Sequence, residues 1–308
     1  MATAREIRRR IQSVRNLGQV TRALQAVAAS NVRKAQVAAL ATRPYASAAW
    51  EVIVNLGTAT DESLHPLLAR RTEVQRILVV LVAGDRGLCG AYNQNVTRAA
   101  QDFVARRGLP ACYITVGRRG RDMLWRAGAE IMAEFHDLPA VPGLADVSAI
   151  ARTAIDEFLE ERVDEVYLSR TDFVNMLVQR PVVQRLLPLC PTDFASPLEG
   201  EQAMREYLVD VRPAQVTEYI YEPDASTVLD AILPRFTELQ VYQAALEAHA
   251  SEFAARMVAM RNATENAAGL VDDLTLVYNK ARQRAITREL LDIAGGAEAL
   301  EQALARAA

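Results

Sequence analysis

The chain has 308 residues, of which 51% are hydrophobic, and this supplies enough nonpolar side chain for the core of one large domain or two ordinary ones. Its net charge of -3 points to no class of partner, and its three cysteines, Cys89, Cys112 and Cys190, lack the paired spacings of zinc sites and redox dithiols. The longest apolar run, residues 77–83, is far shorter than the roughly 20 residues that span a bilayer, so we expect no transmembrane helix.

The N-terminal segment predicts one long helix, from residue 2 to about residue 42. It contains no proline and one glycine, and it is rich in good helix formers. Apolar residues recur along it at spacings built from three and four, namely Ile7, Ile11, Val14, Val20, Leu24, Val27 and Ala35. We expect Pro44 to kink this helix rather than end it, and residues 57–66 to form a linker.

This segment is also strongly basic. Residues 1–43 carry nine Arg or Lys and a single acid, Glu6. Such an arm suits an acidic protein, nucleic acid or anionic lipid, and it is equally typical of the solvated face of a helix. The segment lacks the apolar stretch of a secretory signal, and its helical pattern from Ile7 argues against a transit peptide. We therefore expect a reduced, cytosol-like compartment.

The middle of the chain predicts βαβ units with a mostly parallel sheet. Strand-like runs at residues 76–83, 111–116 and 164–169 alternate with helical stretches near residues 93–107, 118–128 and 147–161. The Pro-rich residues 186–213 predict a loop, and residues 218–221 predict one last short strand.

The C-terminal segment predicts a second, longer helix over residues 235–294. At 1.5 Å per residue it would be about 90 Å long. Steps of four and three alternate without a slip through Phe253, Met257, Met260, Thr264, Ala267, Val271, Leu274, Tyr278, Ala281 and Ala285. This pattern is typical of a coiled-coil seam, the row of residues that faces a partner helix. The N-terminal helix is the only partner of similar length within the chain, so we expect an antiparallel pair whose C-terminal helix outruns its partner and stops at Gly295 and Gly296.

The sequence Gly-Asp-Arg-Gly-Leu-Cys-Gly at residues 84–90 follows a predicted strand, which is where α/β folds bind phosphates. It lacks the Gly-Lys-Ser/Thr of a P-loop and the Gly-x-Gly-x-x-Gly of dinucleotide sites. A nucleophilic Cys89 would need a base, and none of the chain's three histidines, at positions 65, 136 and 249, has a local sequence that suggests pairing. We therefore predict a structural turn, and no catalytic, cofactor-binding or metal-binding residues. The residues of the turn are Asp85, Arg86, Gly87 and Gly90.

A second cluster lies near the end of the C-terminal helix. Residues 279–284 with Thr287 set cations and amide donors around its last predicted turns, and such groups suit an acidic loop of another protein. A solvated cationic face, favoured there by the helix dipole, is the alternative.

Five segments together resemble the γ subunit of F-type ATP synthases. They are residues 7–34 with Val27-Ala28-Ala29-Ser30, the turn at 85–90, residues 219–223, Ala250-Ser251 with residues 254–260, and residues 278–290. The resemblance covers essentially the whole chain in the right order. The chain departs from the usual pattern at Asn31, Leu24, Ala26 and Phe253, and no second cysteine accompanies Cys190 to form a redox switch.

The resemblance implies a central-stalk rotor without chemistry of its own, on the cytoplasmic face of a bacterial membrane. Its implied fold is α/β, a long antiparallel two-helix coiled coil formed by both termini with an inserted Rossmann-like domain. Implied boundaries are 1–57 for the N-terminal helix, 58–222 for the α/β foot and 223–308 for the C-terminal helix. Implied partners are the α, β and ε subunits and the c-ring, with no cofactor. The resemblance places β-subunit contacts at Arg282, Gln283 and Thr287, and c-ring contacts at Tyr219, Tyr221 and Glu222.

Two other functions remain open from the residues alone. A coiled-coil adaptor could bind nucleic acid or anionic membrane through its basic N-terminal helix, and this binding would depend strongly on salt. A small-molecule enzyme built on the α/β insert would instead show a pocket with a perturbed acid or base at the strand ends.

Overall fold

A computed structural model describes residues 3–59, 65–189 and 225–307 of the chain. The elements are α1 (Ala4–Ala59), β1 (Ile77–Val82), α2 (Tyr92–Arg107), β2 (Ala111–Val116), α3 (Arg118–Arg126), β3 (Glu130–Phe135), α4 (Leu144–Leu159), β4 (Glu165–Phe173), β5 (Gln179–Leu187) and α6 (Ala225–Ala307). They form two compact units. The helical unit combines Met1–Ala26 with Met260–Ala308, and the α/β unit is Val27–Ala259. Cys190, most of the predicted loop and the predicted strand at 218–221 lie outside the described residues.

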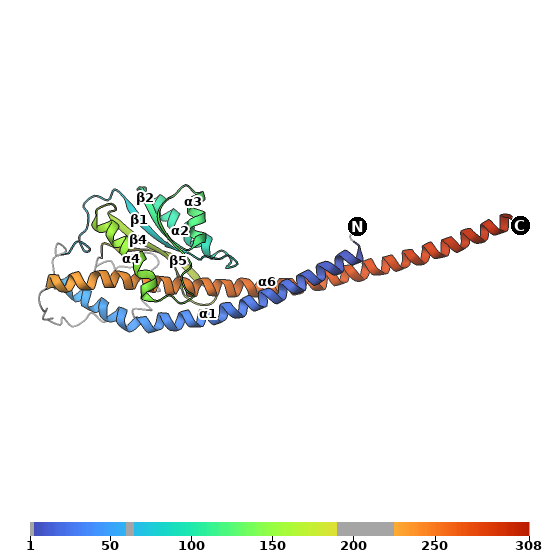
Figure 1. Ribbon diagram of the computed structural model, residues 1–308, viewed down its shortest axis with the longest axis horizontal. Helices are drawn as coiled ribbons and strands as arrows, with labels where there is room; N and C mark the ends of the chain where they lie inside the picture. Colours follow the sequence, from blue (N-terminus) through green and yellow to red (C-terminus); the bar gives the residue numbers. More distant parts are fainter. Residues whose placement is uncertain (1–2, 60–64, 190–224, 308) are drawn as a thin grey trace. The chain divides into compact units, whose positions relative to one another are not determined.

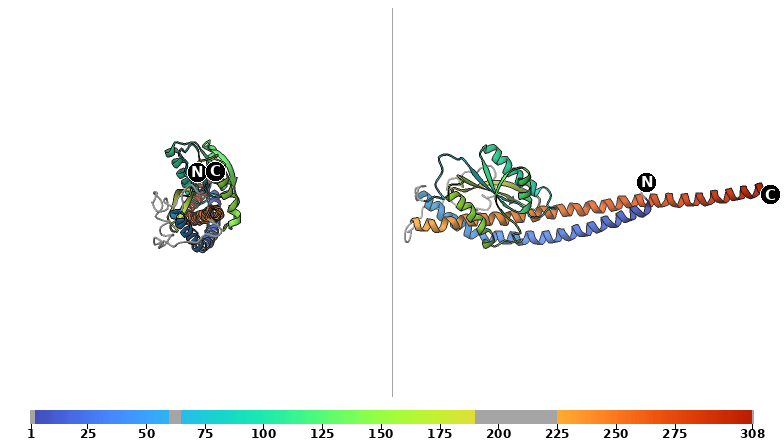
Figure 2. Two further views of the ribbon diagram at one scale, coloured as in Figure 1. Left: turned by 90° about the vertical axis from the view of Figure 1, so that its left-hand side faces the viewer. Right: turned by 45° about the horizontal axis from the view of Figure 1, so that its top comes forward.

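In the helical unit, α1 and α6 pair in antiparallel fashion (Figures 1 and 2). Gly18 of α1 lies opposite Ala267, and Thr21, one turn further along, lies opposite Thr264. On α6 the least exposed residues follow the predicted seam from Met260 to Ala281, while most positions between them are exposed. The predicted coiled coil is therefore confirmed over this stretch. Ala285, the last predicted seam position, is exposed.

On α1 only some of the apolar residues that recur at helical spacing face inward. Val20 and Val27 are 55% and 59% exposed, whereas Gly18 and Thr21 take the inward positions. A Cβ placed on Gly18 would lie 3.5 Å from the Cβ of Ala267, and the hydroxyl oxygens of Thr21 and Thr264 are 2.7 Å apart. Small side chains occupy the seam because they let the two backbones approach closely, and the larger valines are left on the outer face.

Two predictions about helix breakers had different outcomes. Helix α1 continues through Pro44, as expected. Helix α6 does not stop at Gly295 and Gly296 but runs to Ala307. A glycine in an exposed helix costs about 1 kcal/mol relative to alanine, which weakens but does not end a helix flanked by Ala, Glu and Leu.

The α/β unit contains a five-stranded sheet with the order β3-β2-β1-β4-β5. The first four strands are parallel and β5 is antiparallel to β4, which confirms the predicted mostly parallel sheet. Alternate residues of β1 face opposite cores. Leu78 and Val80 face a core that includes α4 and α6, and Ile77 and Val79 face a core that includes α2 and α3. Figure 1 shows these helices around the sheet.

Strands β3 and β5 had not been predicted. Both lie at an edge of the sheet. Strand β3 is only half-buried and carries two glutamates, and β5 contains Pro181 among polar residues. The predicted loop from residue 186 was wrong at its start, because Leu186 and Leu187 are the buried end of β5. Edge strands tolerate charge and proline, so they lack the apolar run of a central strand.

No helix among the described residues has the length and apolarity needed to cross a membrane.

Candidate functional site

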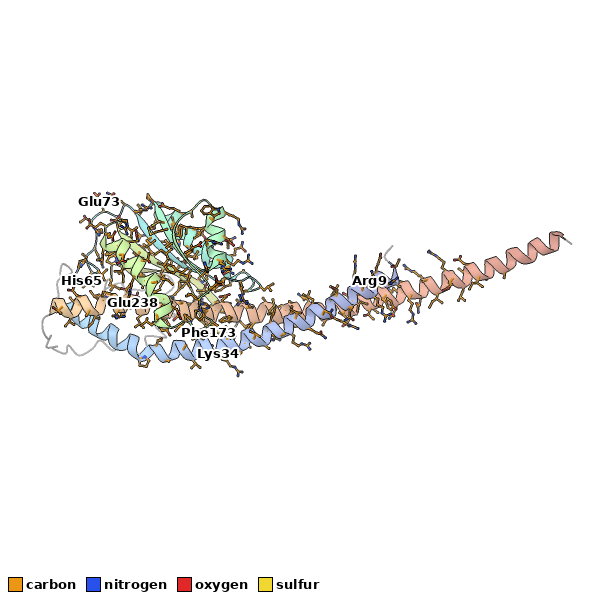
Figure 3. All side chains as sticks on the ribbon, viewed as in Figure 1. Arg9, Lys34, His65, Glu73, Phe173 and Glu238 are labelled. Carbon is orange, nitrogen blue, oxygen red and sulfur yellow. The ribbon has the colours of Figure 1, made fainter. Side chains whose placement is uncertain are left out.

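The predicted contact residues Arg282, Gln283 and Thr287 lie on the outermost part of α6 in the helical unit. Every side chain from residue 282 to residue 297 is exposed. In Figure 3 the end of α6 extends past the start of α1, which the labelled Arg9 marks, and no other described element lies beside it. Gln283 and Thr287 are four residues apart and share one side of the helix. We call residues 282–297 the α6 tip.

The α6 tip combines two kinds of surface. Residues 279–288 contain four Arg or Lys and no acid, so this stretch is strongly cationic. Apolar side chains also stand on the tip, Ile286 within this stretch and Leu290 and Ile293 beyond it. They are 46%, 61% and 65% exposed and follow a spacing of four and three. This apolar stripe was not predicted, although its spacing of four and three can be read in the sequence. Large exposed apolar side chains that stand in a row are a candidate surface for contact with a partner.

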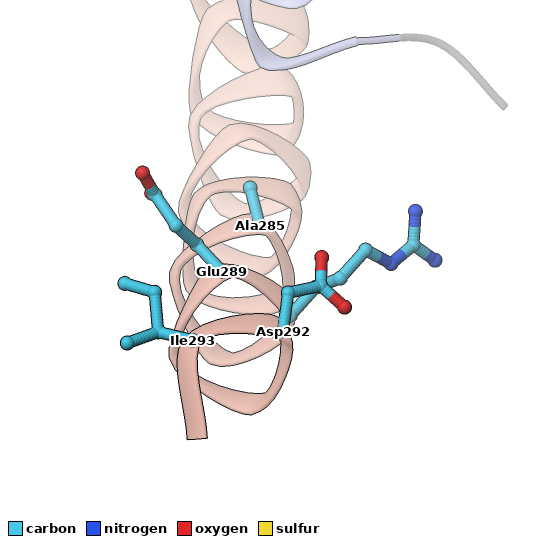
Figure 4. A pocket seen from close by; sticks show the side chains of 5 residues that line it. Ala285, Glu289, Asp292 and Ile293 are labelled. Atoms are coloured by element: carbon cyan, nitrogen blue, oxygen red, sulfur yellow. The ribbon is translucent and has the colours of Figure 1, made fainter. Parts of the chain in front are cut away.

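A hollow on the α6 tip offers no site for a small molecule. Its lining residues are Ala285, Arg288, Glu289, Asp292 and Ile293. All five project from one helix, as Figure 4 shows, so no second described element closes the hollow. Among the described residues no group of three His, Cys, Asp or Glu is placed to hold a metal ion.

In the α/β unit, the turn at 84–90 is fixed by its own polar groups. The two carboxylate oxygens of Asp85 accept hydrogen bonds from the backbone N–H of Arg118 at 3.0 Å and of Asp137 at 2.9 Å. The Asn93 amide oxygen accepts from the N–H of Gly84 at 2.8 Å, and its Nδ2 donates to the carbonyl of Arg86 at 3.2 Å. Gly90 has φ 60°, which glycine adopts without strain. These bonds hold the backbone of the turn, and its purely structural role stays a prediction.

Helix α6 packs into this turn through an ion pair. Arg256 donates to the carbonyl of Gly87 from Nε at 3.4 Å and from Nη2 at 3.3 Å, and it also binds the Glu252 carboxylate. A Cβ placed on Gly84 would lie 2.6 Å from Oε1 of Glu252, so a larger residue there would push this carboxylate from its position. Both charged side chains are largely buried, at 8% and 13% exposure. We call Glu252 and Arg256 the α6 clamp.

The clamp fills the place where folds of this topology bind phosphate. That place lies beyond the carboxyl end of β1, next to the start of α2. Here the Glu252 carboxylate, paired with Arg256, lies against Gly84 and takes up the space that a phosphate would need. The interaction was not predicted, because Arg256 and Gly87 are 169 residues apart in the sequence.

Cys89 lacks the surroundings of a nucleophile. The thiol is buried and accepts a hydrogen bond from Asn93 Nδ2 at 3.2 Å. Burial, assisted by the nearby Glu252 carboxylate, raises the pKa of the Cys89 thiol, so the reactive thiolate is disfavoured at neutral pH. His65 and His136 contact Asp230 at 3.2 Å and Asp137 at 3.0 Å, respectively.

Tyr219, Tyr221 and Glu222, the residues predicted to contact a membrane ring, lie outside the described residues.

Comparison with known proteins agrees with the resemblance over nearly the whole chain. The family model described as ATP synthase matches residues 3–300. The ATP synthase gamma chain of Dehalococcoides mccartyi is 46% identical over 302 residues, covering 97% of this chain and 100% of the relative.

Two structures of the Euglena gracilis mitochondrial ATP synthase contain a chain of similar fold. The rotor structure gives a TM-score of 0.61 at 19% identity and covers 92% of this chain and 98% of that chain. The structure with OSCP, F1 and the c-ring gives 0.64 at 19% identity and covers 96% and 94%.

Proposed function

Because this chain belongs to the ATP synthase gamma-chain family, we propose that its two units serve as the shaft and foot of a rotor. The chain is the central-stalk subunit of an F-type ATP synthase, which couples ion flow to ATP synthesis and hydrolysis by rotation. The proposed division into shaft and foot rests on one observation. Helices α1 and α6 pair in antiparallel fashion, and α6 continues past residue 281 with exposed side chains. A rotating shaft needs a stiff stretch, which the paired helices supply. It also needs an unpaired end that the subunits of the catalytic head can surround.

The α6 tip is proposed to contact the β subunits of the catalytic head through Arg282, Gln283 and Thr287. Their cationic and amide groups suit acidic loops, and no acid lies within residues 279–288 to compete for them. Exposed ion pairs are worth about 0–1 kcal/mol each, so such contacts can form and break during each turn. The apolar stripe at Ile286, Leu290 and Ile293 is proposed to line the bearing as well.

The other end of the rotor is proposed to rest on the c-ring through Tyr219, Tyr221 and Glu222, with the ε subunit bound to the α/β foot. One of the two Euglena structures holds F1 and the c-ring in a single assembly, which supports these partners. We retain 1–57, 58–222 and 223–308 as the functional division into helix, foot and helix. The proposed location is the cytoplasmic face of a bacterial membrane, reached through the complex.

We further infer that the chain catalyses no reaction itself. The clamp occupies the phosphate position of the α/β fold, and Cys89 is buried as a thiol. These features weigh against the small-molecule enzyme. The adaptor hypothesis, based on the basic N-terminal helix, is not favoured, because the family model and the relatives cover the chain as a whole.

A double variant, R282A with Q283A, tests the proposed contact. In the assembled synthase we expect a clear loss of ATP-driven ion pumping per ATP hydrolysed, because the α6 tip loses polar contacts with the β subunits. The measurement is pumping in vesicles alongside ATP hydrolysis, with circular dichroism to verify that the shaft stays folded. Arg98→Ala, an exposed change on α2, is the matched control and should leave pumping unchanged. Normal pumping by the double variant would rule out this role for Arg282 and Gln283.

A further inference from the structure

His249 lies directly beside the clamp on helix α6. Its ring is stacked on Phe253, with ring centres 6.0 Å apart and planes inclined by 30°. Its Nδ1 atom is buried, has no hydrogen-bond partner among the described residues, and is 4.0 Å from Oε2 of Glu252. Arg256 also contacts Phe253, with its guanidinium 5.7 Å from the centre of that ring. A titratable ring is therefore packed into the contact between α6 and the turn.

Charges from two elements act on this ring. On α6 these are Glu252 and Arg256, and from the turn it is Asp85. The turn and α2 also present Cys89 and Tyr92 beside the clamp, both uncharged at neutral pH, because burial raises the pKa of each.

Other charged groups near this stretch of α6 are engaged or exposed. On β4, Arg170 is held by Asp172 and by Glu247, which is 3.4 Å away. On α1, Arg33 and Lys34 are exposed.

The ring is neutral in the closed contact. Burial is the largest influence and lowers the pKa of His249, and it outweighs the opposite effect of the Glu252 and Asp85 carboxylates, while Arg256 adds to the lowering. If the contact opens, water reaches the ring and its pKa returns toward about 6.5. The open form therefore binds a proton more readily than the closed form. By linkage, the closed form is favoured above about pH 6.5 and loses ground as pH falls below this value.

We propose that His249 makes the contact between α6 and the turn at 84–90 sensitive to pH, so that protonation of the ring in mild acid opens the clamp. The His249 imidazolium would lie beside Arg256, and the two cations would face the single carboxylate of Glu252. Release of Glu252 and Arg256 frees the Gly87 carbonyl and uncovers Gly84. The foot is then held less firmly to the helix that continues into the shaft, so acid is expected to loosen the mechanical link within the rotor.

Hydrogen exchange on the full chain tests this proposal. Peptides covering residues 84–93 are followed by mass spectrometry at pH 7.5, 6.5 and 5.5, beside the variant His249→Leu. Because intrinsic exchange depends on pH equally in both proteins, the ratio of their rates isolates the histidine. The ratio of the wild-type rate to the variant rate should rise by up to about tenfold between pH 7.5 and 5.5. At pH 5.5, one unit below an open-state pKa near 6.5, protonation of the open form can favour opening by about this factor.

Two further variants make the outcome decisive. His249→Gln keeps a polar side chain that does not titrate, and it replaces the leucine variant if that protein fails to fold. Arg98→Ala, an exposed change on α2 that leaves every histidine in place, should behave as wild type. Peptides from β2 serve as an internal reference in the core. A ratio that stays constant with pH, or that falls in acid, would overturn the proposal.

Discussion

At the scale of single residues, two glycines allow neighbouring elements to approach the turn closely. Gly84 makes room for the Glu252 carboxylate, and Gly117 brings the start of α3 against the end of β1. Gly117 has φ 95°, and a Cβ there would lie 2.2 Å from the carbonyl oxygen of Ala83. Sequence patterns recognise such glycines as turns. They do not reveal the neighbour that excludes a side chain, because that neighbour comes from another element.

Gly117→Ala is expected to destabilise the α/β unit by about 2–4 kcal/mol, since a backbone oxygen cannot move aside as a flexible side chain can. Gly128→Ala is the matched control. Gly128 also has positive φ, 74°, but faces open space, so its replacement should cost only about 1 kcal/mol for the backbone conformation. Denaturant unfolding of both variants gives the comparison. Equal losses would show that the close approach at Ala83 does not matter.

At the scale of elements, predictability followed burial and side-chain size. Strands β1 and β2 were predicted because their runs are apolar on both faces, and the start of β4 was predicted through its short apolar run at residues 166–168. Strands β3 and β5 lie at sheet edges and carry charge or proline. The seam of α6 was predicted through its larger side chains. The inward positions of α1 could not be recognised from apolar residues alone, because glycine and threonine hold two of them while Val20 and Val27 lie outside. The clamp joins distant residues and leaves no local pattern.

At Gly18 of α1, two substitutions are predicted to change the stability of the helical unit in opposite directions. Gly18→Ala should stabilise the helical unit by up to about 1 kcal/mol, because helix propensity improves and the added Cβ lies at an ordinary 3.5 Å from Ala267. Gly18→Leu should instead destabilise it by about 1–3 kcal/mol through overpacking.

Hydrogen exchange of residues 4–26 measures both effects at Gly18. Val20→Leu, on the exposed outer face, should change little and serves as the control. If Gly18→Leu were as stable as Gly18→Ala, the close approach of the two helices at this point would be contradicted.

At the scale of the whole molecule, helix α6 belongs to both units. Within the α/β unit it carries Glu252 and Arg256 against the turn, and within the helical unit it carries the seam from Met260 to Ala281. A single continuous helix thus makes the contacts of the foot and those of the shaft. This continuity allows torque applied to the foot to reach the α6 tip without crossing a loop.

Rotation of single molecules tests the central claim most directly. The chain is assembled with α and β subunits, the head is fixed to a surface, and a bead is attached to the α/β unit through Arg126→Cys on exposed α3. We predict that ATP drives the bead around in one direction and that rotation stops when ATP is removed. An assembly that hydrolyses ATP while its bead only fluctuates, with no net direction, would contradict the assignment of this chain as the rotor.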